Sequence, residues 1–241
     1  MEKKLVLSLE KLDEVFYGLC NLFNEYNFYE ISAKLLEFIS SKNTFLYQYE
    51  HAKILLFQKD YSQVIEISNK IIDAADNKTK SDAYILCGNA YYFQNNLFDS
   101  EEAYVQAIKN NAKSDPEMLF KLGITYIKRK TWEDAKVVFL KLIKENHGFA
   151  WRYLGLAYTR LEEYEFAEEA LNEANLLDID NSDLWRYLTL FTLCTHRKSQ
   201  ALECLKEMNK YKYEEIPILV EIASTFNKQF SKLLTFKHLT R

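Results

Sequence analysis

The side chains that could carry out chemistry are scattered along this chain and form no catalytic motif. The four histidines follow no H-E-x-x-H pattern and have no cysteine at metal-ligand spacing: His51, His147, His196 and His238. A zinc site needs ligands at such close spacing. A glycine-rich phosphate loop and a G-x-S-x-G elbow are missing, and Asp178 and Asp180 suit helix capping better than acid–base catalysis. The sequence therefore predicts a protein that is not an enzyme, with no metal and no cofactor.

The cysteines indicate packing and not disulfides or metal binding. None of Cys20, Cys87, Cys194 and Cys204 belongs to a C-x2-C pair. Cys20 and Cys87 fall at positions expected to pack between helices, where a thiol acts as a small apolar side chain. Unpaired cysteines of this kind are typical of a reducing compartment, so we expect a cytoplasmic protein.

Composition and charge restrict the class of protein further. Of the 241 residues 48% are hydrophobic and 15% aromatic, with only 5 Gly and 2 Pro, which favours a folded all-helical chain. Lys and Arg total 31 against 35 Asp and Glu, so the basic surface of a general nucleic-acid binder is not expected. No stretch approaches the ~18 to 20 apolar residues of a membrane span, and no signal peptide is recognisable at the start.

The elements that must position any binding residues are repeated in steps of about 34 residues. Trp151, Leu154, Gly155 and Tyr158 spell W-x2-L-G-x2-Y, and this pattern resembles the tetratricopeptide-repeat (TPR) family. The same frame recurs on both sides of this unit. The resemblance implies helical hairpins that cannot bury their apolar faces alone and therefore stack into a solenoid with a concave binding surface.

Six such units fit the chain, starting near residues 13, 45, 81, 116, 148 and 182. We expect an all-α, right-handed superhelical solenoid over residues 1–231, closed by a capping helix at 215–231 and followed by a basic tail at 232–241. At the other end Leu5, Leu9 and Leu12 carry apolar surface ahead of the first unit. This surface predicts association through the N-terminal helix.

Small residues at matching positions predict close crossings between the two helices of a hairpin. A glycine on the first helix is expected to face a small residue on the second in three pairs: Gly88 with Ser100, Gly123 with Ala135, and Gly155 with Ala167. Each helical glycine costs about 1 kcal/mol relative to alanine, so its recurrence argues for a packing requirement.

TPR geometry implies which residues face the concave groove, at positions 2, 5, 9, 12 and 13 of each unit. The predicted groove residues are Tyr49, Phe57, Ile85, Asn89, Tyr92, Phe93, Phe120, Ile124, Lys128, Arg152, Leu156, Arg160 and Arg186. Such a groove is aromatic in its first half and basic in its second, which suits a protein segment with apolar anchors followed by carboxylates. As alternatives, the aromatic residues pack between hairpins and the arginines are solvated surface charge.

The fifth and sixth units carry a closer resemblance. The runs Ala150–Tyr158 and Ala167–Asp178, followed by Leu184 and Trp185, resemble the C-terminal repeats of cilia- and flagella-associated protein seventy over about residues 147–230. Members of that family have a long region ahead of the repeats that is missing here, so we expect either a C-terminal fragment or a shortened relative.

This resemblance implies a non-catalytic structural component of the axoneme of motile cilia or flagella, with axonemal proteins as partners. The alternative is a soluble cytosolic TPR adaptor without a ciliary role. A third class, a helical-repeat subunit of an enzyme, would need catalytic residues on a partner chain.

Overall fold

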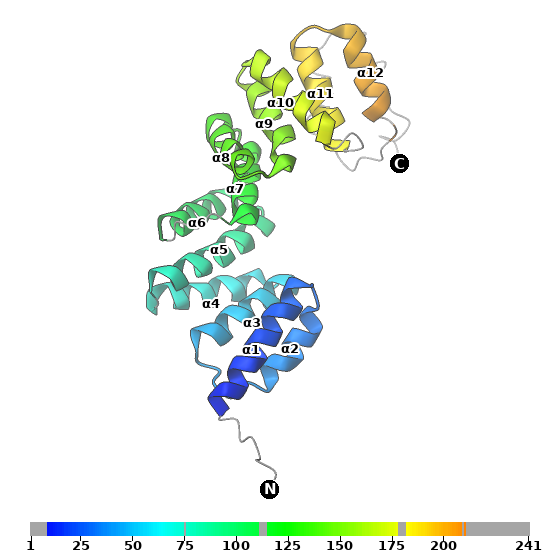
Figure 1. The fold of residues 1–241 in the computed structure, drawn as a ribbon. Helices are drawn as coiled ribbons and strands as arrows, with labels where there is room; N and C mark the ends of the chain where they lie inside the picture. Colours follow the sequence, from blue (N-terminus) through cyan, green and yellow to red (C-terminus); the bar gives the residue numbers. More distant parts are fainter. Residues whose placement is uncertain (1–8, 75, 111–114, 178–181, 209, 211–241) are drawn as a thin grey trace. The chain divides into compact units, whose positions relative to one another are not determined.

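The computed structural model describes residues 9–74, 76–110, 115–177, 182–208 and 210, and within these ranges the chain is helical with no strand (Figure 1). Its residues divide into two compact units, Met1–Arg129 and Lys130–Arg241, called here the N-terminal and C-terminal units. The prediction of an all-α TPR fold is confirmed. The expected capping helix at 215–231, the tail at 232–241 and Leu5 lie outside the described residues.

The N-terminal unit contains three helical hairpins and one further helix. The bounds of its helices are α1 Leu9–Glu25, α2 Tyr29–Glu37, α3 Phe45–Phe57, α4 Tyr61–Ala74, α5 Asn77–Phe93, α6 Leu97–Asn110 and α7 Pro116–Arg129. The two helices of each hairpin pack against each other, and each hairpin also contacts the next. Apolar faces are therefore buried both within and between hairpins.

The C-terminal unit continues the alternation of first and second helices. Its elements are α8 Trp132–Lys144, the short 3-10 helix η1 Gly148–Ala150, α9 Trp151–Arg160, α10 Tyr164–Leu177, α11 Ser182–Cys194 and α12 Lys198–Met208. α9 contacts α8, α10 and α11, so it is enclosed on several sides.

The hairpin turns share one backbone conformation, although none uses glycine. A left-handed residue follows the first helix of every hairpin: Asn27, Lys59, Asn95, Lys130, Glu162 and His196, with φ between 59° and 65°. The next amide closes the turn by donating back into the helix, as from Asp60 to the Leu55 carbonyl at 3.0 Å. This is the usual way to satisfy the last carbonyls of a helix, and asparagine is among the non-glycine residues that tolerate it best.

The predicted close crossings are seen within each unit. The Ser100 hydroxyl donates to the Gly88 carbonyl at 3.1 Å, which confirms that pair. A Cβ at Gly88 would lie 2.5 Å from the Tyr104 ring, and one at Gly155 would lie 2.6 Å from Leu171. These glycines are therefore required by contact between helices. Gly123 and Ala135 are buried, each in its own unit.

The sequence also predicts two helix starts, with an acid before a proline at Asp115–Pro116 and a capping box from Thr131 to Asp134. The first is confirmed and the second is wrong. α7 begins at Pro116, and the Asp115 carboxylate accepts from the Glu117 amide at 3.0 Å. Thr131 precedes α8, but its side chain makes no capping hydrogen bond, so the expected capping box does not form. Its backbone, at φ −89° and ψ 77°, lies outside the extended region from which such caps are made.

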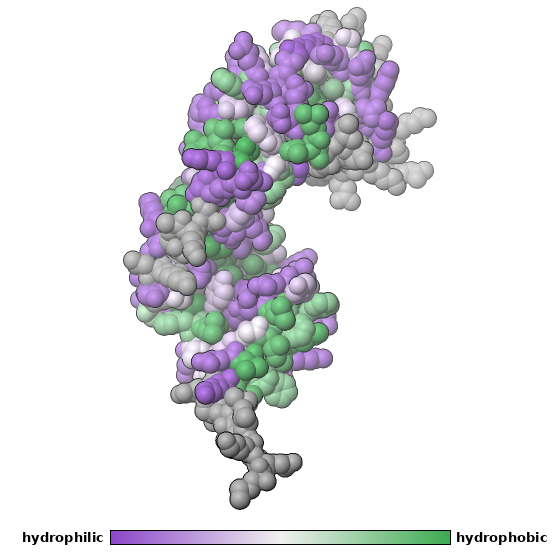
Figure 2. Space-filling model, viewed as in Figure 1, coloured by the Kyte–Doolittle hydropathy of each residue, from purple (hydrophilic) through white to green (hydrophobic). Residues whose placement is uncertain are grey.

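An exposed apolar stripe at three- and four-residue spacing runs along α1 and into the turn that follows it. The residues of this stripe are Leu12, Val15, Leu19, Leu22 and Tyr26. Figure 2 shows apolar side chains gathered over α1 and α2. Such an arrangement is the seam with which a helix packs on another helix. Among the described residues, no helix combines the length and apolar character needed to cross a membrane.

Candidate peptide-binding surfaces

The first helices of successive hairpins contact one another and form what we call the groove face of each unit. In the N-terminal unit this face comprises α1, α3, α5 and α7, and in the C-terminal unit α9 and α11. The predicted groove residues lie on these helices. The two groove faces are described separately below.

A cavity of about 760 Å³ opens across α1, α3 and α5, and we call it the α1–α3–α5 cavity. Its apolar and aromatic lining consists of Tyr17, Phe45, Leu46 and Tyr49. Its carboxylates are Glu14, Glu50, Asp76 and Asp82, and no lysine or arginine is among the described residues that line it. Of the predicted groove residues only Tyr49 lies here. The volume is in the range of sites that bind ligands.

Side-chain hydrogen bonds hold the elements around this cavity in place. The Thr44 hydroxyl accepts from the Tyr47 amide and caps α3, and it lies 2.8 Å from the Tyr17 hydroxyl on α1. Asp76 caps α5 by accepting from the Thr79 amide at 2.9 Å. The cavity is therefore formed where two helix starts face α1.

Asp13 fixes α1 to the segment that follows α2. Its carboxylate accepts from the Ser40 amide and hydroxyl, at 3.0 and 2.9 Å, and from the amide and hydroxyl of Ser41. The Ser41 hydroxyl and the Ser40 amide are the main reasons why the pKa of Asp13 falls from 3.8 to about 2. This clasp keeps α1 in position beside the cavity.

Tyr49 stays protonated because of its surroundings. Burial is the main cause that raises its pKa, and the negative charges of Asp82, Glu50 and Asp115 raise it further. The Lys53 ammonium lies 5.3 Å from the centre of the Tyr49 ring. The Tyr49 hydroxyl therefore offers a neutral donor in a negative environment.

A buried polar network joins α1 to α3 beside the cavity. Glu50 is buried, accepts from the Asn24 amide at 2.7 Å, and pairs with Lys53 at 3.2 Å. Lys53 also donates to the Asn21 carbonyl oxygen at 3.1 Å. The Glu50 charge is thus compensated locally, as a buried carboxylate requires.

A second network, of basic and aromatic residues, joins α5 to α7. Asn89 accepts from the Tyr104 hydroxyl at 2.9 Å and from the Lys121 ammonium at 3.0 Å. Lys121 lies 5.5 Å from the centre of the Phe93 ring, and Lys128 lies 4.5 Å from that of Tyr92. Four predicted groove residues, Asn89, Tyr92, Phe93 and Lys128, are therefore brought together. Ile85, Phe120 and Ile124 are half-buried on the same helices.

Two of the predicted aromatic residues also pack between hairpins. Phe57 stacks on Tyr29 of α2 with ring centres 4.3 Å apart, and Phe93 stacks on Tyr61 of α4 at 6.0 Å. Both pairs join the end of one first helix to the start of the preceding second helix. Phe57 and Phe93 are nevertheless 54% and 49% exposed, so packing leaves half of each side chain accessible.

In the C-terminal unit an aromatic ladder is buried under the predicted arginines. Phe139, Tyr153 and Tyr187 follow one another with ring centres 5.3 and 5.9 Å apart. Arg152 lies 4.7 Å from the centre of the Tyr153 ring, and both Arg152 and Arg186 act on the pKa of Tyr187, which burial raises. The two arginines therefore lie at the edge of one buried tyrosine pair.

The arginines of this unit are partly engaged within the chain. Arg186 forms an ion pair with Asp183, and Arg160 lies 5.5 Å from the centre of the Trp132 ring. Each keeps a partly exposed side chain. The surface here is therefore basic, but the ion pair with Asp183 offsets the positive charge of Arg186.

The prediction that Leu156 faces the groove is wrong. Leu156 is only 1% exposed. Because α9 is packed against α8, α10 and α11, this leucine lies in the core. The sequence signal that distinguishes it from the polar Asn89 at the matching position is its apolar side chain.

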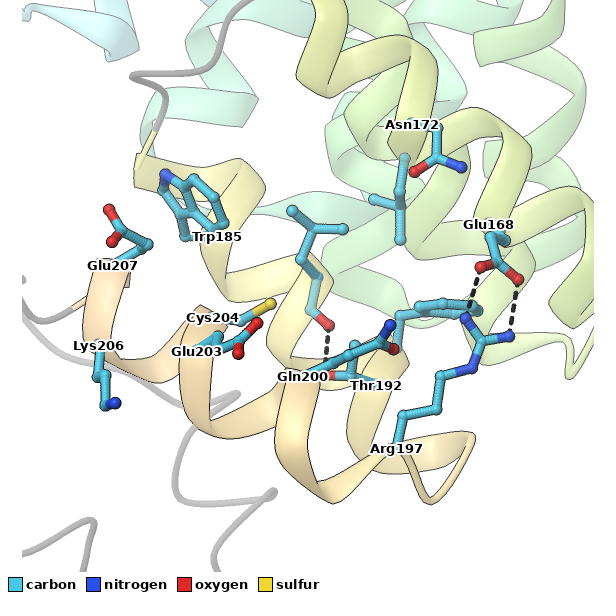
Figure 3. A pocket seen from close by; sticks show the side chains of 13 residues that line it. Glu168, Asn172, Trp185, Thr192, Arg197, Gln200, Glu203, Cys204, Lys206 and Glu207 are labelled. Atoms are coloured by element: carbon cyan, nitrogen blue, oxygen red, sulfur yellow. Dashed lines mark hydrogen bonds and ion pairs between the residues drawn. The ribbon is translucent and has the colours of Figure 1, made fainter.

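A further cavity of about 650 Å³ lies among α10, α11 and α12 and contains none of the predicted groove residues (Figure 3). Arg197 and Glu168 form a two-bonded ion pair at 2.5 and 2.7 Å on one side, and Trp185 and Cys204 lie on the other. Burial, followed by the charge of Glu203, raises the pKa of the Cys204 thiol to about 11. The thiol is therefore protonated and a poor nucleophile at neutral pH.

The described residues contain no group of three or more His, Cys, Asp or Glu side chains that could hold a metal ion. The lining residues missed by sequence reasoning, such as Glu14, Gly18 and Asp82, belong to no motif. Only their position on the groove face of consecutive hairpins distinguishes them.

The fold and its groove faces define a TPR protein. Two solved TPR-like chains share the fold. Pseudomonas aeruginosa pilF has a TM-score of 0.70 at 13% identity, and the match covers 90% of this chain and 99% of that one. YrrB, a TPR protein with an unusual peptide-binding site, has a TM-score of 0.64 at 15% identity, and the match covers 80% of this chain and 97% of that one.

This chain belongs to the family of the cilia and flagella-associated protein 70 C-terminal domain, whose sequence model matches residues 50–232. The human cilia- and flagella-associated protein 70 is 33% identical over 140 residues, which are 57% of this chain and 12% of that protein. The chain thus corresponds to a small part of its relative. The predicted family resemblance is confirmed.

Proposed function

We propose that the chain is a non-catalytic TPR scaffold that holds a segment of a partner protein on its groove faces in the axoneme of motile cilia or flagella. The family match over residues 50–232 is the observation that carries this proposal. The groove faces supply the chemistry, because exposed aromatic rings and cations lie on adjacent first helices.

The basic parts of the two groove faces favour partner segments that carry apolar and acidic side chains. Lys128 and Tyr92 form such a part in the N-terminal unit, and Arg152 and Arg160 in the C-terminal unit. A carboxylate would meet a guanidinium already held by an aromatic ring, so little side-chain freedom would be lost on binding.

Association with axonemes is the direct test of this function. The tagged chain is expressed in a ciliated cell, and its retention in axonemes is measured after detergent extraction. Retention is expected, whereas complete release with the cytosolic fraction would favour the alternative, a cytosolic TPR adaptor.

We also propose that the apolar stripe of α1 is an association surface. Val15 and Tyr26 are 51% and 67% exposed, and the spacing of the stripe suits an opposing helix. Replacing Val15, Leu22 and Tyr26, the most exposed residues of the stripe, with glutamine should abolish concentration-dependent association in analytical ultracentrifugation without lowering the melting temperature. A wild-type chain that stays monomeric at high concentration would contradict this.

A further inference from the structure

A smaller cavity, of about 300 Å³, lies between the second helices α4 and α6 of the N-terminal unit, and we call it the α4–α5–α6 cavity. α5 contributes Tyr84, Cys87 and Tyr91 to it, whereas the groove residues of α5 are not part of its lining. α6 contributes the carboxylates of Asp99 and Glu102. The volume is at the lower end of the range of ligand-binding cavities, so the cavity suits a single side chain better than a whole segment.

Both carboxylates of this cavity lack a cation in the part of the chain that the structure describes. Asp99 accepts a hydrogen bond at 2.6 Å from the side-chain amide of Asn96, but this amide is neutral and occupies only Oδ2. Asp99 lies in the first turn of α6, where the helix dipole favours the ionised form. Glu102 is exposed and has no hydrogen bond or ion pair with any described residue. Two uncompensated negative charges are therefore left at one cavity.

The tyrosines of the cavity lie beside these charges. Tyr84 and Tyr91 are both half-buried. Burial is the main cause that raises the pKa of the Tyr91 hydroxyl, and the negative charges of Asp99 and Glu102 raise it further, so both carboxylates act on the same neutral phenol. Aromatic surface next to carboxylates suits a long cationic side chain, whose methylene stem packs on the rings while its charged end reaches the acids.

The cavity among α10, α11 and α12 is built from the same positions of the repeat. Tyr84 corresponds to Trp185 at position 4 of the repeats that start near residues 81 and 182. Glu102 corresponds in the same way to Glu203 at position 22. The two cavities are therefore one feature of the repeat, found once in each unit.

In the C-terminal unit the chain supplies this cavity with its own cation. Arg197, at position 16 of its repeat, lies 5.2 Å from the centre of the Phe191 ring and forms the two-bonded ion pair with Glu168 (Figure 3). Position 16 of the repeat that forms the α4–α5–α6 cavity holds the neutral Asn96. A cation from outside the chain would take the place that Arg197 fills in the other unit.

We infer that the α4–α5–α6 cavity binds one lysine or arginine side chain of a partner protein, with its stem on Tyr84 and Tyr91 and its charged end between Asp99 and Glu102. This inference goes beyond the proposed function, which concerns the groove faces, because it adds a binding site between second helices.

The test compares two end-blocked five-residue peptides, one with arginine between pairs of serines and one with citrulline in place of arginine. Citrulline has the same length and shape without the charge. Dissociation constants are measured at low salt from the amide chemical shifts of the ¹⁵N-labelled full chain. The arginine peptide should bind about tenfold more tightly and should shift amides of α5 and α6.

A first variant removes the charges of the cavity. Asp99→Asn with Glu102→Gln keeps the side-chain shapes and should abolish the preference for arginine over citrulline. Glu165→Gln with Glu169→Gln is the matched control, because it removes two exposed carboxylates from the second helix α10, and it should bind as wild type does. Melting temperatures are measured for both.

A second variant gives the cavity a cation of its own. Asn96→Arg places an arginine at the repeat position of Arg197, next to Asp99, and should weaken the arginine peptide about tenfold. Gln94→Arg adds the same charge at the end of α5, outside the cavity lining, and should have a much smaller effect.

Equal binding of the two peptides would overturn the inference, as would a preference that the Asp99→Asn, Glu102→Gln variant retains. A preference that appears only after residues 232–241 are removed would also overturn it, since the chain's own tail would then be the occupant. These titrations use the isolated chain. Release of the chain from axonemes would therefore refute the proposed function and leave this inference standing.

Discussion

The groove face is hollow in the N-terminal unit and filled in the C-terminal unit. Position 9 of the repeat shows the difference: it holds the polar Asn21, Lys53 and Asn89 and the half-buried Ile124 in the N-terminal unit, but the buried Leu156 and Leu190 in the C-terminal unit. The same place in the repeat frame can therefore be a hydrogen-bonding surface or a core position. Neighbouring helices decide which, because α9 is packed against three others while the α1–α3–α5 cavity stays open.

Exchanging the polar and apolar residues at position 9 should have the largest effect on the free energy of unfolding. Leu156→Asn places an amide in the core without a partner and should cost about 2–5 kcal/mol of unfolding free energy. Asn89→Leu loses hydrogen bonds to Lys121 and Tyr104 and should cost only about 1 kcal/mol. Urea unfolding measures both. Similar costs for the two variants would mean that the two groove faces do not differ as described.

Replacing a glycine with leucine should have opposite effects on stability in the two units. Gly155→Leu would force a Cβ to within 2.6 Å of Leu171 and should destabilise the chain by about 1–3 kcal/mol. Gly18→Leu meets nothing within 4 Å and should stabilise it by up to about 1 kcal/mol through helix propensity. Thermal melting of both variants compares them directly. A loss of stability in Gly18→Leu would show that the cavity is not open.

The stacked aromatic pairs should contribute less to the free energy of unfolding than the core positions do. Phe57→Ala removes the stack on Tyr29 but exposes little new surface, because Phe57 is already half-exposed, and a loss of about 0.5–1.5 kcal/mol is expected. Tyr29→Ala should give a similar loss, and the double variant should lose less than the sum. Fully additive losses would indicate that the two rings do not interact.

Replacing Asp13 should have the smallest effect on stability, and this effect should depend on pH. Since its pKa is lowered from 3.8 to about 2, the carboxylate stabilises the fold above pH 3.8, and this contribution disappears as the pH falls towards 2. The difference in urea midpoint between wild type and Asp13→Asn should therefore be full at neutral pH and shrink across this window. A difference that is the same at both ends would argue against the clasp with Ser40 and Ser41.

Much of the fold could be predicted from the sequence, because the repeat is a local pattern. The pattern W-x2-L-G-x2-Y marks the first helices. The small residue opposite each glycine predicts a close crossing of the two helices of a hairpin, and the hydrogen bond from Ser100 to Gly88 confirms one such crossing. The failed cap at Thr131 depends on backbone angles that the residue type does not determine.

Less of the candidate sites can be predicted from the sequence. The repeat frame places Tyr49 and Asn89 on first helices, so both can be predicted. The frame does not show how closely α9 is enclosed, so it does not predict that Leu156 is buried. Glu14 and Asp82 cannot be predicted, because they lie far apart in the sequence and meet only when α1, α3 and α5 stack.

Photo-crosslinking within axonemes tests most directly whether a partner is held on the groove faces. A benzoylphenylalanine replaces Tyr92 or Arg152 on the first helices, or Val137 or Phe166, which are exposed on the second helices α8 and α10. The account predicts discrete adducts from Tyr92 and Arg152 in the detergent-resistant fraction and none from the other two. Adducts formed only from Val137 and Phe166 would contradict it.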